Sequence, residues 1–86
     1  MNKIIWHNRA RKQIKRIPRQ YQDAIIQNID LLADFPKSRE LDIKGLKNHV
    51  YDYRMRIGRY RVLFDHDDCI KIISIQEVKK RDDHTY

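Results

Sequence analysis

Three arginines in the second half of the chain have the type and spacing that suit phosphate chemistry. Arg54 and Arg56 are two residues apart, and Arg61 follows shortly after them. A guanidinium group binds phosphate through a planar fork of N–H donors and keeps its charge at neutral pH. Several such groups around one phosphodiester would stabilise the negative charge that builds on its oxygens during cleavage. The arginines therefore predict a phosphodiester-binding surface, provided that the fold brings them together.

The C-terminal segment adds further groups of this kind. Lys79 and Lys80 are followed by Arg81, which we expect to join the three arginines in holding the phosphate. His84 is the type of side chain that best transfers protons near neutral pH, and we expect it to act as acid or base. Tyr86 can serve as a base or stack on a nucleobase. These groups predict that the tail approaches the same surface.

An alternation of apolar and polar residues places the three arginines on a β-hairpin. Residues 51–57 and 60–64 each alternate, which predicts two strands. A two-residue turn at Gly58-Arg59 would use the positive φ that glycine tolerates in a type II′ turn. The resulting register gives the apolar pairs Ile57–Tyr60, Met55–Val62 and Tyr53–Phe64 on one face, and the pair Arg56–Arg61 on the other. Because like charges across a strand pair cost stability, we expect an anion to bind between the two arginines.

The first half of the chain predicts a strand and two helices. Lys3–Trp6 has the pattern of a short strand, and Asn8 can cap a helix whose apolar residues recur at helical spacing. Pro18 suits the first turn of a second helix. That helix should end at Phe35, because the residue before Pro36 disfavours helical backbone. We expect its inner face to consist of Tyr21, Ala24, Ile25, Ile29 and Leu32.

The second half completes the sheet. We expect Lys37–Asn48 to be a polar connection, Asp67-Asp68 to form a turn, and Cys69–Val78, which is apolar on both faces, to be a central strand. The order β-α-α-β-β-β predicts one α+β domain over residues 1–86, with a small, mainly antiparallel sheet and both helices on one face. The open face would bind RNA through Arg54, Arg59, Lys79 and Lys80.

Length, charge and cysteine content narrow the classes of function. The chain has 86 residues, 41% of them hydrophobic, enough for one modest core. Lys and Arg number 19 against 12 Asp and Glu, and the net charge of +7 indicates a polyanionic partner. No apolar stretch approaches the roughly 20 residues needed to cross a bilayer. The single cysteine, Cys69, excludes an intrachain disulfide or a CxxC metal site. We expect a cytoplasmic protein that uses no metal or cofactor and has no membrane partner.

Three segments of the chain resemble the RelE/ParE toxin superfamily. Leu46–His49 and Tyr53–Phe64 are similar to the signature L-K-(G/N)…Y-R-(L/M)-R-(I/V)-G-x-Y-R-(V/L)-(I/L)-(Y/F), and Val78–Tyr86 to its closing (H/K)-(R/K)-x-x-x-Y. The early strand and two helices fit as well, so the resemblance covers nearly the whole chain. It implies a RelE/ParE-like fold and a toxin of a bacterial type II toxin–antitoxin pair.

The resemblance also implies an activity and its residues. RelE-type members cleave mRNA in the ribosomal A site, whereas ParE-type members inhibit DNA gyrase. The RelE active site uses a basic pair on a strand, an arginine after G-x-Y, and a tail arginine and tyrosine, which match Arg54 and Arg56, Arg61, Arg81 and Tyr86. The RelE pair is typically lysine. Since arginine is a poor proton acceptor, the identity of the general base stays open.

The prediction from the sequence is therefore an mRNA endoribonuclease that works on the ribosome and inhibits translation. Its partners would be mRNA, the ribosome and a cognate antitoxin whose acidic, partly disordered segment folds over the basic surface. Two alternatives remain: a ParE-like gyrase inhibitor and a nucleic-acid-binding module without catalysis. His49, just before the signature strand, and Glu40, in the polar connection, are further candidates for the site. We expect His7 and His66 to lie at the surface, and the acidic run at residues 65–68 to form a turn rather than a metal site.

Overall fold

A computed structural model describes residues 1–37 and 40–81. The chain begins with a strand and two helices, as predicted, and four strands follow instead of three. His84 and Tyr86 lie outside the described residues. The elements are β1 (Lys3–Trp6), α1 (Asn8–Lys15), α2 (Arg19–Asp30), the 3-10 helix η1 (Leu31–Asp34), β2 (Asp42–Gly45), β3 (Tyr53–Ile57), β4 (Tyr60–Asp67) and β5 (Ile72–Lys80).

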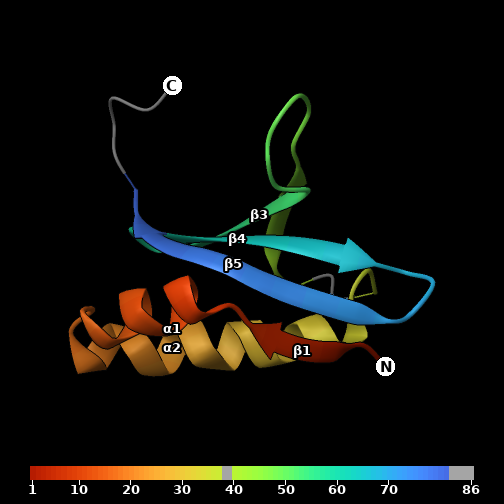
Figure 1. Cartoon of the computed structure of the whole chain (residues 1–86). Helices are drawn as coiled ribbons and strands as arrows, with labels where there is room; N and C mark the ends of the chain where they lie inside the picture. Colours follow the sequence, from red (N-terminus) through yellow and green to blue (C-terminus); the bar gives the residue numbers. More distant parts are fainter. Residues whose placement is uncertain (38–39, 82–86) are drawn as a thin grey trace.

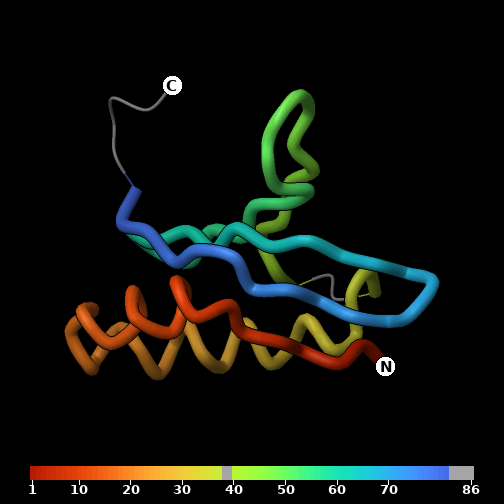
Figure 2. Tube along the Cα trace, in the orientation of Figure 1, coloured from red at the N-terminus to blue at the C-terminus, as the bar shows by residue number. Residues whose placement is uncertain are grey.

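The strands form one mixed sheet in the order β1-β5-β4-β3-β2. β1 pairs with β5 in parallel, and the other neighbours are antiparallel. Both helices lie against one face, which we call the inner face, so the α+β prediction with the helix pair on one side is confirmed (Figure 1). The connection between β2 and β3 rises above the opposite, outer face (Figure 2). Within the described residues, no helix has the length and apolar character needed to span a membrane.

The core lies between the inner face and the two helices. α1 contributes Ala10 and Ile14, while α2 contributes Ile25 and Ile29. They pack on strand residues that point to the inner face at every second position. The strand residues of this core are Met55, Tyr60, Val62, Phe64, Ile73, Ile75 and Val78. Burial of this apolar stripe is the main favourable contribution to folding, and it leaves the outer face for polar side chains.

The β3–β4 hairpin has the predicted register. Arg56 lies opposite Arg61, and the three predicted apolar pairs also form. Gly58 has a φ of 56°, and Arg59 is not among the residues with positive φ, as a type II′ turn requires. β5 lies between β1 and β4, so its prediction as a central strand is confirmed, although it starts at Ile72 rather than at Cys69.

Two details of the helices differ from the sequence-based prediction. The N-cap of α1 is His7 rather than Asn8, because the Nδ1 atom of His7 accepts a hydrogen bond from the Arg9 backbone N–H at 3.3 Å. Tyr21 is 45% exposed and Ala24 is also exposed. The inner face of α2 is therefore narrower than predicted, since the sheet covers its later turns more fully than its start.

The predicted polar connection over Lys37–Asn48 is wrong, because it contains strand β2. Asp42–Gly45 pairs with β3, and Ile43 lies opposite Met55 and packs against the core. A four-residue edge strand presents too few alternating positions to stand out from a polar loop. β2 nevertheless matters for the outer face, since it places Asp42 directly opposite Arg56.

Candidate functional site

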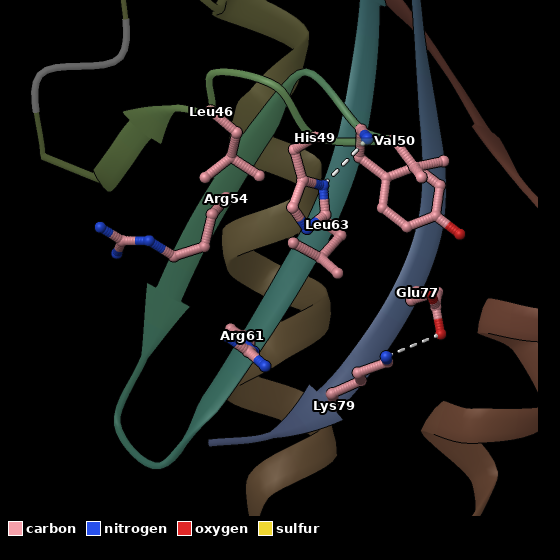
Figure 3. A pocket seen from close by; sticks show the side chains of 9 residues that line it. Leu46, His49, Val50, Arg54, Arg61, Leu63, Glu77 and Lys79 are labelled. Carbon is pink, nitrogen blue, oxygen red and sulfur yellow. Dashed lines mark hydrogen bonds and ion pairs between the residues drawn. The ribbon is translucent and has the colours of Figure 1, made fainter. Parts of the chain in front are cut away.

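A groove of about 380 Å³ runs across the outer face. Its floor is formed by β3, β4 and β5, and one wall is the connection of residues 46–52, which we call the overhanging loop (Figure 3). This volume falls within the usual range of small-molecule pockets. The residues that line this outer groove are Leu46, His49, Val50, Tyr51, Arg54, Arg61, Leu63, Glu77 and Lys79.

Three cations form a row across adjacent strands, and two of them, Arg61 and Lys79, line the outer groove. Arg61 on β4 lies opposite Arg56 on β3 and opposite Lys79 on β5. Neighbouring strands are about 4.8 Å apart, so the three side chains leave the sheet next to one another. Asp42 on β2 ends the row beside Arg56. One carboxylate thus offsets part of the like-charge repulsion that the sequence had suggested an anion must relieve.

Arg54 is held differently from the other cations. It is 9% exposed, and its Nη1 atom lies 3.5 Å from Oδ1 of Asp42. In Figure 3 its guanidinium group points away from Arg61. The stem of Arg54 therefore lines the outer groove while its charge is paired with β2. The guanidinium group of Arg54 is therefore not directed into the groove, where we had expected it to contact RNA.

The remaining predicted residues lie around the end of the hairpin. The backbone N–H of Arg81 donates to the carbonyl oxygen of Arg59, which brings the end of β5 to the Gly58-Arg59 turn. Arg59 itself is exposed in that turn. Lys80 lies opposite Tyr60, a core residue, so strand alternation places Lys80 on the inner-face side of the sheet, away from Lys79. The tail candidates His84 and Tyr86 lie outside the described residues.

His49, a secondary candidate in the sequence, lines the outer groove. The preceding Asn48 has a φ of 54°, a left-handed conformation that asparagine tolerates better than most residues. The Nδ1 atom of His49 accepts a hydrogen bond from the Tyr51 backbone N–H at 3.1 Å. In the neutral ring the proton must then sit on Nε2, and Figure 3 shows this second nitrogen pointing toward Leu63 on the groove floor. His49 is thus oriented as a hydrogen-bond donor to the groove.

Glu77 is the residue of the site that sequence reasoning missed. Its side chain accepts hydrogen bonds from Gln13 of α1 at 3.3 Å and pairs with Lys79 at 3.4 Å. Its other partner is Arg9 of α1, at 3.8 Å. Desolvation by burial raises the pKa of Glu77, but the nearby Tyr51 hydroxyl, the hydrogen bond from Gln13 and the charge of Lys79 outweigh it and hold this pKa below its ordinary value. Glu77 is therefore a firmly ionised carboxylate rather than a proton acceptor.

Tyr51 shares this network from the overhanging loop. Its hydroxyl accepts a hydrogen bond from Nη1 of Arg9 at 2.7 Å. Desolvation and the nearby carboxylate of Glu77 raise the pKa of Tyr51, so the phenol stays protonated at neutral pH. Among the described residues, no group of three or more His, Cys, Asp or Glu side chains is arranged to hold a metal ion. Glu40 and His66 do not line the outer groove.

The sequence was compared with models of protein families. Residues 4–84 match the model described as ParE toxin of type II toxin–antitoxin system, parDE. The chain belongs to the ParE toxin family. This result confirms the predicted membership of the RelE/ParE superfamily. A comparison with curated protein sequences finds no match.

Solved structures similar in fold to this ParE-family toxin include RelE proteins and their complexes. A chain of the archaeal RelE–RelB complex from Pyrococcus horikoshii OT3 is 25% identical with a TM-score of 0.81, covering 95% of this chain and 97% of that one. A chain of the RelBE2 complex from Mycobacterium tuberculosis is 23% identical with a TM-score of 0.79, covering 93% and 98%. The isolated RelE toxin of E. coli is 13% identical with a TM-score of 0.78, covering 99% and 89%. The last two show likeness of fold alone.

Proposed function

We propose that this ParE-family toxin is an endoribonuclease that cleaves mRNA on the ribosome and so inhibits translation. The observation that carries the proposal is the row of Arg56, Arg61 and Lys79 across three adjacent strands at the outer groove. Adjacent cations of this kind bind a phosphodiester and stabilise the extra negative charge of its transition state. The net charge of +7 favours a polyanionic substrate such as RNA.

The cleavage proposed here is a transesterification within the RNA strand. The 2′-oxygen loses its proton and bonds to the adjacent phosphorus, while the bond from phosphorus to the 5′-oxygen breaks and that oxygen takes up a proton. Products are a 2′,3′-cyclic phosphate and a 5′-hydroxyl. Arg56, Arg61 and Arg81 would hold the phosphoryl oxygens, and the Nε2 N–H of His49 would add one neutral donor.

Proton transfer is assigned in this proposal to the tail. Neither Glu77, whose pKa is lowered, nor Tyr51, whose pKa is raised, suits proton exchange near neutral pH. His84 is proposed as acid or base and Tyr86 as base or stacking platform. Because few side chains of the site suit proton transfer, we favour a reaction in which the ribosome positions the mRNA. Arg54, Arg59, Lys79 and Lys80 would add contacts to the RNA backbone.

A cognate antitoxin is proposed as the protein partner. Two of the similar folds were solved as complexes of RelE with RelB, from P. horikoshii OT3, and of RelBE2, from M. tuberculosis. The basic outer face suits an acidic segment that folds on binding. The toxin would act in the cytoplasm, where mRNA and ribosomes are.

Mapping of mRNA ends tests the proposed activity. Purified protein is incubated with a defined mRNA, with and without programmed ribosomes, and the new 5′ ends are identified. Arg61→Ala should lower cleavage about 100-fold, the usual cost of one oxyanion donor, with unchanged thermal stability. Lys44→Ala is the matched control, because it removes one exposed positive charge on the edge strand, outside the groove. Intact mRNA in both wild-type reactions would overturn the proposal.

A second candidate function rests on the family match itself, since the matching model describes ParE toxins. The protein would then inhibit DNA gyrase by binding. The discriminating measurement is DNA supercoiling by purified gyrase at rising protein concentration. Inhibition that persists in Arg61→Ala, with mRNA left intact, would favour this candidate. A third reading, a binding module without catalysis, predicts that mRNA is bound but uncut and that gyrase is unaffected.

A further inference from the structure

A carboxylate at the floor of a cationic groove is unexpected in a protein that binds phosphate. Glu77 lines the outer groove next to Lys79, and its side chain is 13% exposed. Its negative charge repels the proposed substrate and weakens the field of the neighbouring cation. A buried charge of this kind also loses its hydration, which only close partners can offset. The residue therefore needs a role that outweighs both costs.

The network around Glu77 draws on three separate parts of the chain. Gln13 and Arg9 lie on α1 and Lys79 on β5, and Arg9 in turn donates to the Tyr51 hydroxyl on the overhanging loop at 2.7 Å. α1 is fixed independently at this point, because Oε1 of Gln13 accepts a hydrogen bond from the backbone N–H of Val78 at 2.7 Å. The network thus joins one projecting loop to a rigid helix–strand junction.

The tip of the overhanging loop has few other ties to the body of the protein. The base of the loop is closed by a hydrogen bond from the Leu46 N–H to the carbonyl oxygen of Asp52, and the Asp52 N–H donates to Oδ1 of Asp65 on β4. Both bonds lie at the ends of the loop. Val50, near its tip, is 84% exposed. The side-chain contacts of Tyr51 are therefore placed to fix the tilt of the tip over the groove.

We propose that Glu77 is a positioning residue, which holds the overhanging loop over the outer groove through Arg9, whose Nη1 atom lies 3.8 Å from Glu77 and donates to the hydroxyl of Tyr51 at 2.7 Å. The His49 ring, whose Nδ1 accepts the Tyr51 backbone N–H, is oriented by the same contact. The lowered pKa of Glu77 fits this role, because an ionised carboxylate accepts all its hydrogen bonds at once. The inference rests on the proposed function only for its effect on RNA cleavage.

The test is a double-mutant cycle with two independent readouts. Tyr51→Phe removes the hydroxyl and keeps the ring, while Glu77→Gln removes the charge and keeps the shape. The first readout is amide hydrogen exchange of residues 46–51. The second is mRNA cleavage, with kcat and KM measured separately. Asp68→Asn serves as the control, because Asp68 pairs with Lys71 in the exposed β4–β5 turn and does not line the groove.

Each single variant should speed exchange in the loop about tenfold and leave exchange in β4 and β5 unchanged, since the closed base of the loop does not depend on Glu77. Because the cationic row remains, kcat should fall about tenfold through misplacement of His49. KM should stay within about twofold for Tyr51→Phe, and should fall for Glu77→Gln, which removes a charge that repels RNA. The double variant should match the stronger single variant, because both act through the same chain of contacts from Glu77 through Arg9 to Tyr51.

Two results would overturn the inference: unchanged loop exchange in both single variants, or effects on exchange that multiply in the double variant. If Glu77→Gln does not fold, Tyr51→Phe alone still decides, since that hydroxyl is a small group at the end of a half-buried ring. If the wild-type protein leaves mRNA intact, the proposed function fails. The exchange cycle would still measure whether Glu77 holds the loop.

Discussion

Both faces of the sheet contain buried residues, but these residues are buried by different means. On β4, Val62 points to the inner face and is fully buried, and its neighbour Leu63 points to the outer face and is 5% exposed. The inner face is covered by apolar side chains of two helices. The outer face is covered by a loop, and charged residues lie among its apolar ones. Burial alone therefore does not separate core from site.

The two faces differ in what their buried groups require. The inner face needs only close packing, so many apolar sequences would serve. On the outer face each buried charge requires a partner: Asp42 for Arg54, and Lys79 with α1 for Glu77. Substitutions on the inner face should consequently lower stability, whereas substitutions on the outer face should change activity with a smaller loss of stability.

Phe64→Ala should give the largest loss of stability. Phe64 is fully buried, stacks on Tyr53 at 5.4 Å and meets Phe35 edge-on at 5.6 Å. Truncating a buried phenylalanine costs about 3–5 kcal/mol, a large part of the 5–15 kcal/mol that is usual for a small domain. Urea unfolding gives the change in free energy. Val50→Ala, on the exposed loop tip, should stay within about 0.5 kcal/mol, and equal effects of the two would refute the contrast.

Gly58→Ala should have the next largest effect, because the turn fixes the register that separates the faces. Gly58 has a φ of 56°, and no atom lies within 4 Å of an added Cβ. The cost is therefore one of backbone conformation, about 1–2 kcal/mol. Gly45→Ala is the control, since its Cβ would meet Tyr53 at an ordinary 3.8 Å. Thermal melts that rank the two variants in the opposite order would contradict this explanation.

The hairpin could be predicted from the sequence because its causes are local. Alternation and one glycine determine the turn, and the turn determines that Arg56 faces Arg61. The apolar stripe of α2 was predicted in part for the same reason: Ile25 and Ile29 are buried, whereas Tyr21 at the start of the helix is not.

The missed features depend on contacts between distant parts of the chain. β2 is a strand because β3 supplies its hydrogen-bond partners, and its own four residues carry little signal. Glu77 lies in the segment Cys69–Val78, which we predicted as a central strand from its isoleucine residues. Its partner Gln13 is 64 positions away, and no local pattern connects them. His49 was considered from its position, but the hydrogen bond that orients its ring follows from the left-handed backbone of Asn48.

Acid should weaken the outer face before the inner face. Although desolvation raises the pKa of Glu77, the nearby Tyr51 hydroxyl, the hydrogen bond from Gln13 and the charge of Lys79 bring it below the ordinary 4.5. A lowered pKa in the folded state means that ionised Glu77 stabilises the protein fully above pH 4.5 and loses this effect as the pH falls through the folded-state value. The difference in unfolding free energy between wild type and Glu77→Gln should therefore shrink toward low pH, as measured by urea unfolding at several pH values. A constant difference would contradict the assignment.

Asp68→Asn should have the smallest effect, which sharpens the contrast between the two carboxylates. A hydrogen bond from Lys71 at 2.7 Å, and the charge of that lysine, lower the pKa of Asp68 below its ordinary 3.8. The sign of its pH dependence is thus the same as for Glu77. Asp68 is largely exposed, however, so water and salt screen the pair. We expect the urea midpoint of Asp68→Asn to coincide with that of the wild type at pH 7 in moderate salt. A midpoint shift as large as that of Glu77→Gln would mean that burial of the ion-pair partners does not explain why the outer face is sensitive to charge.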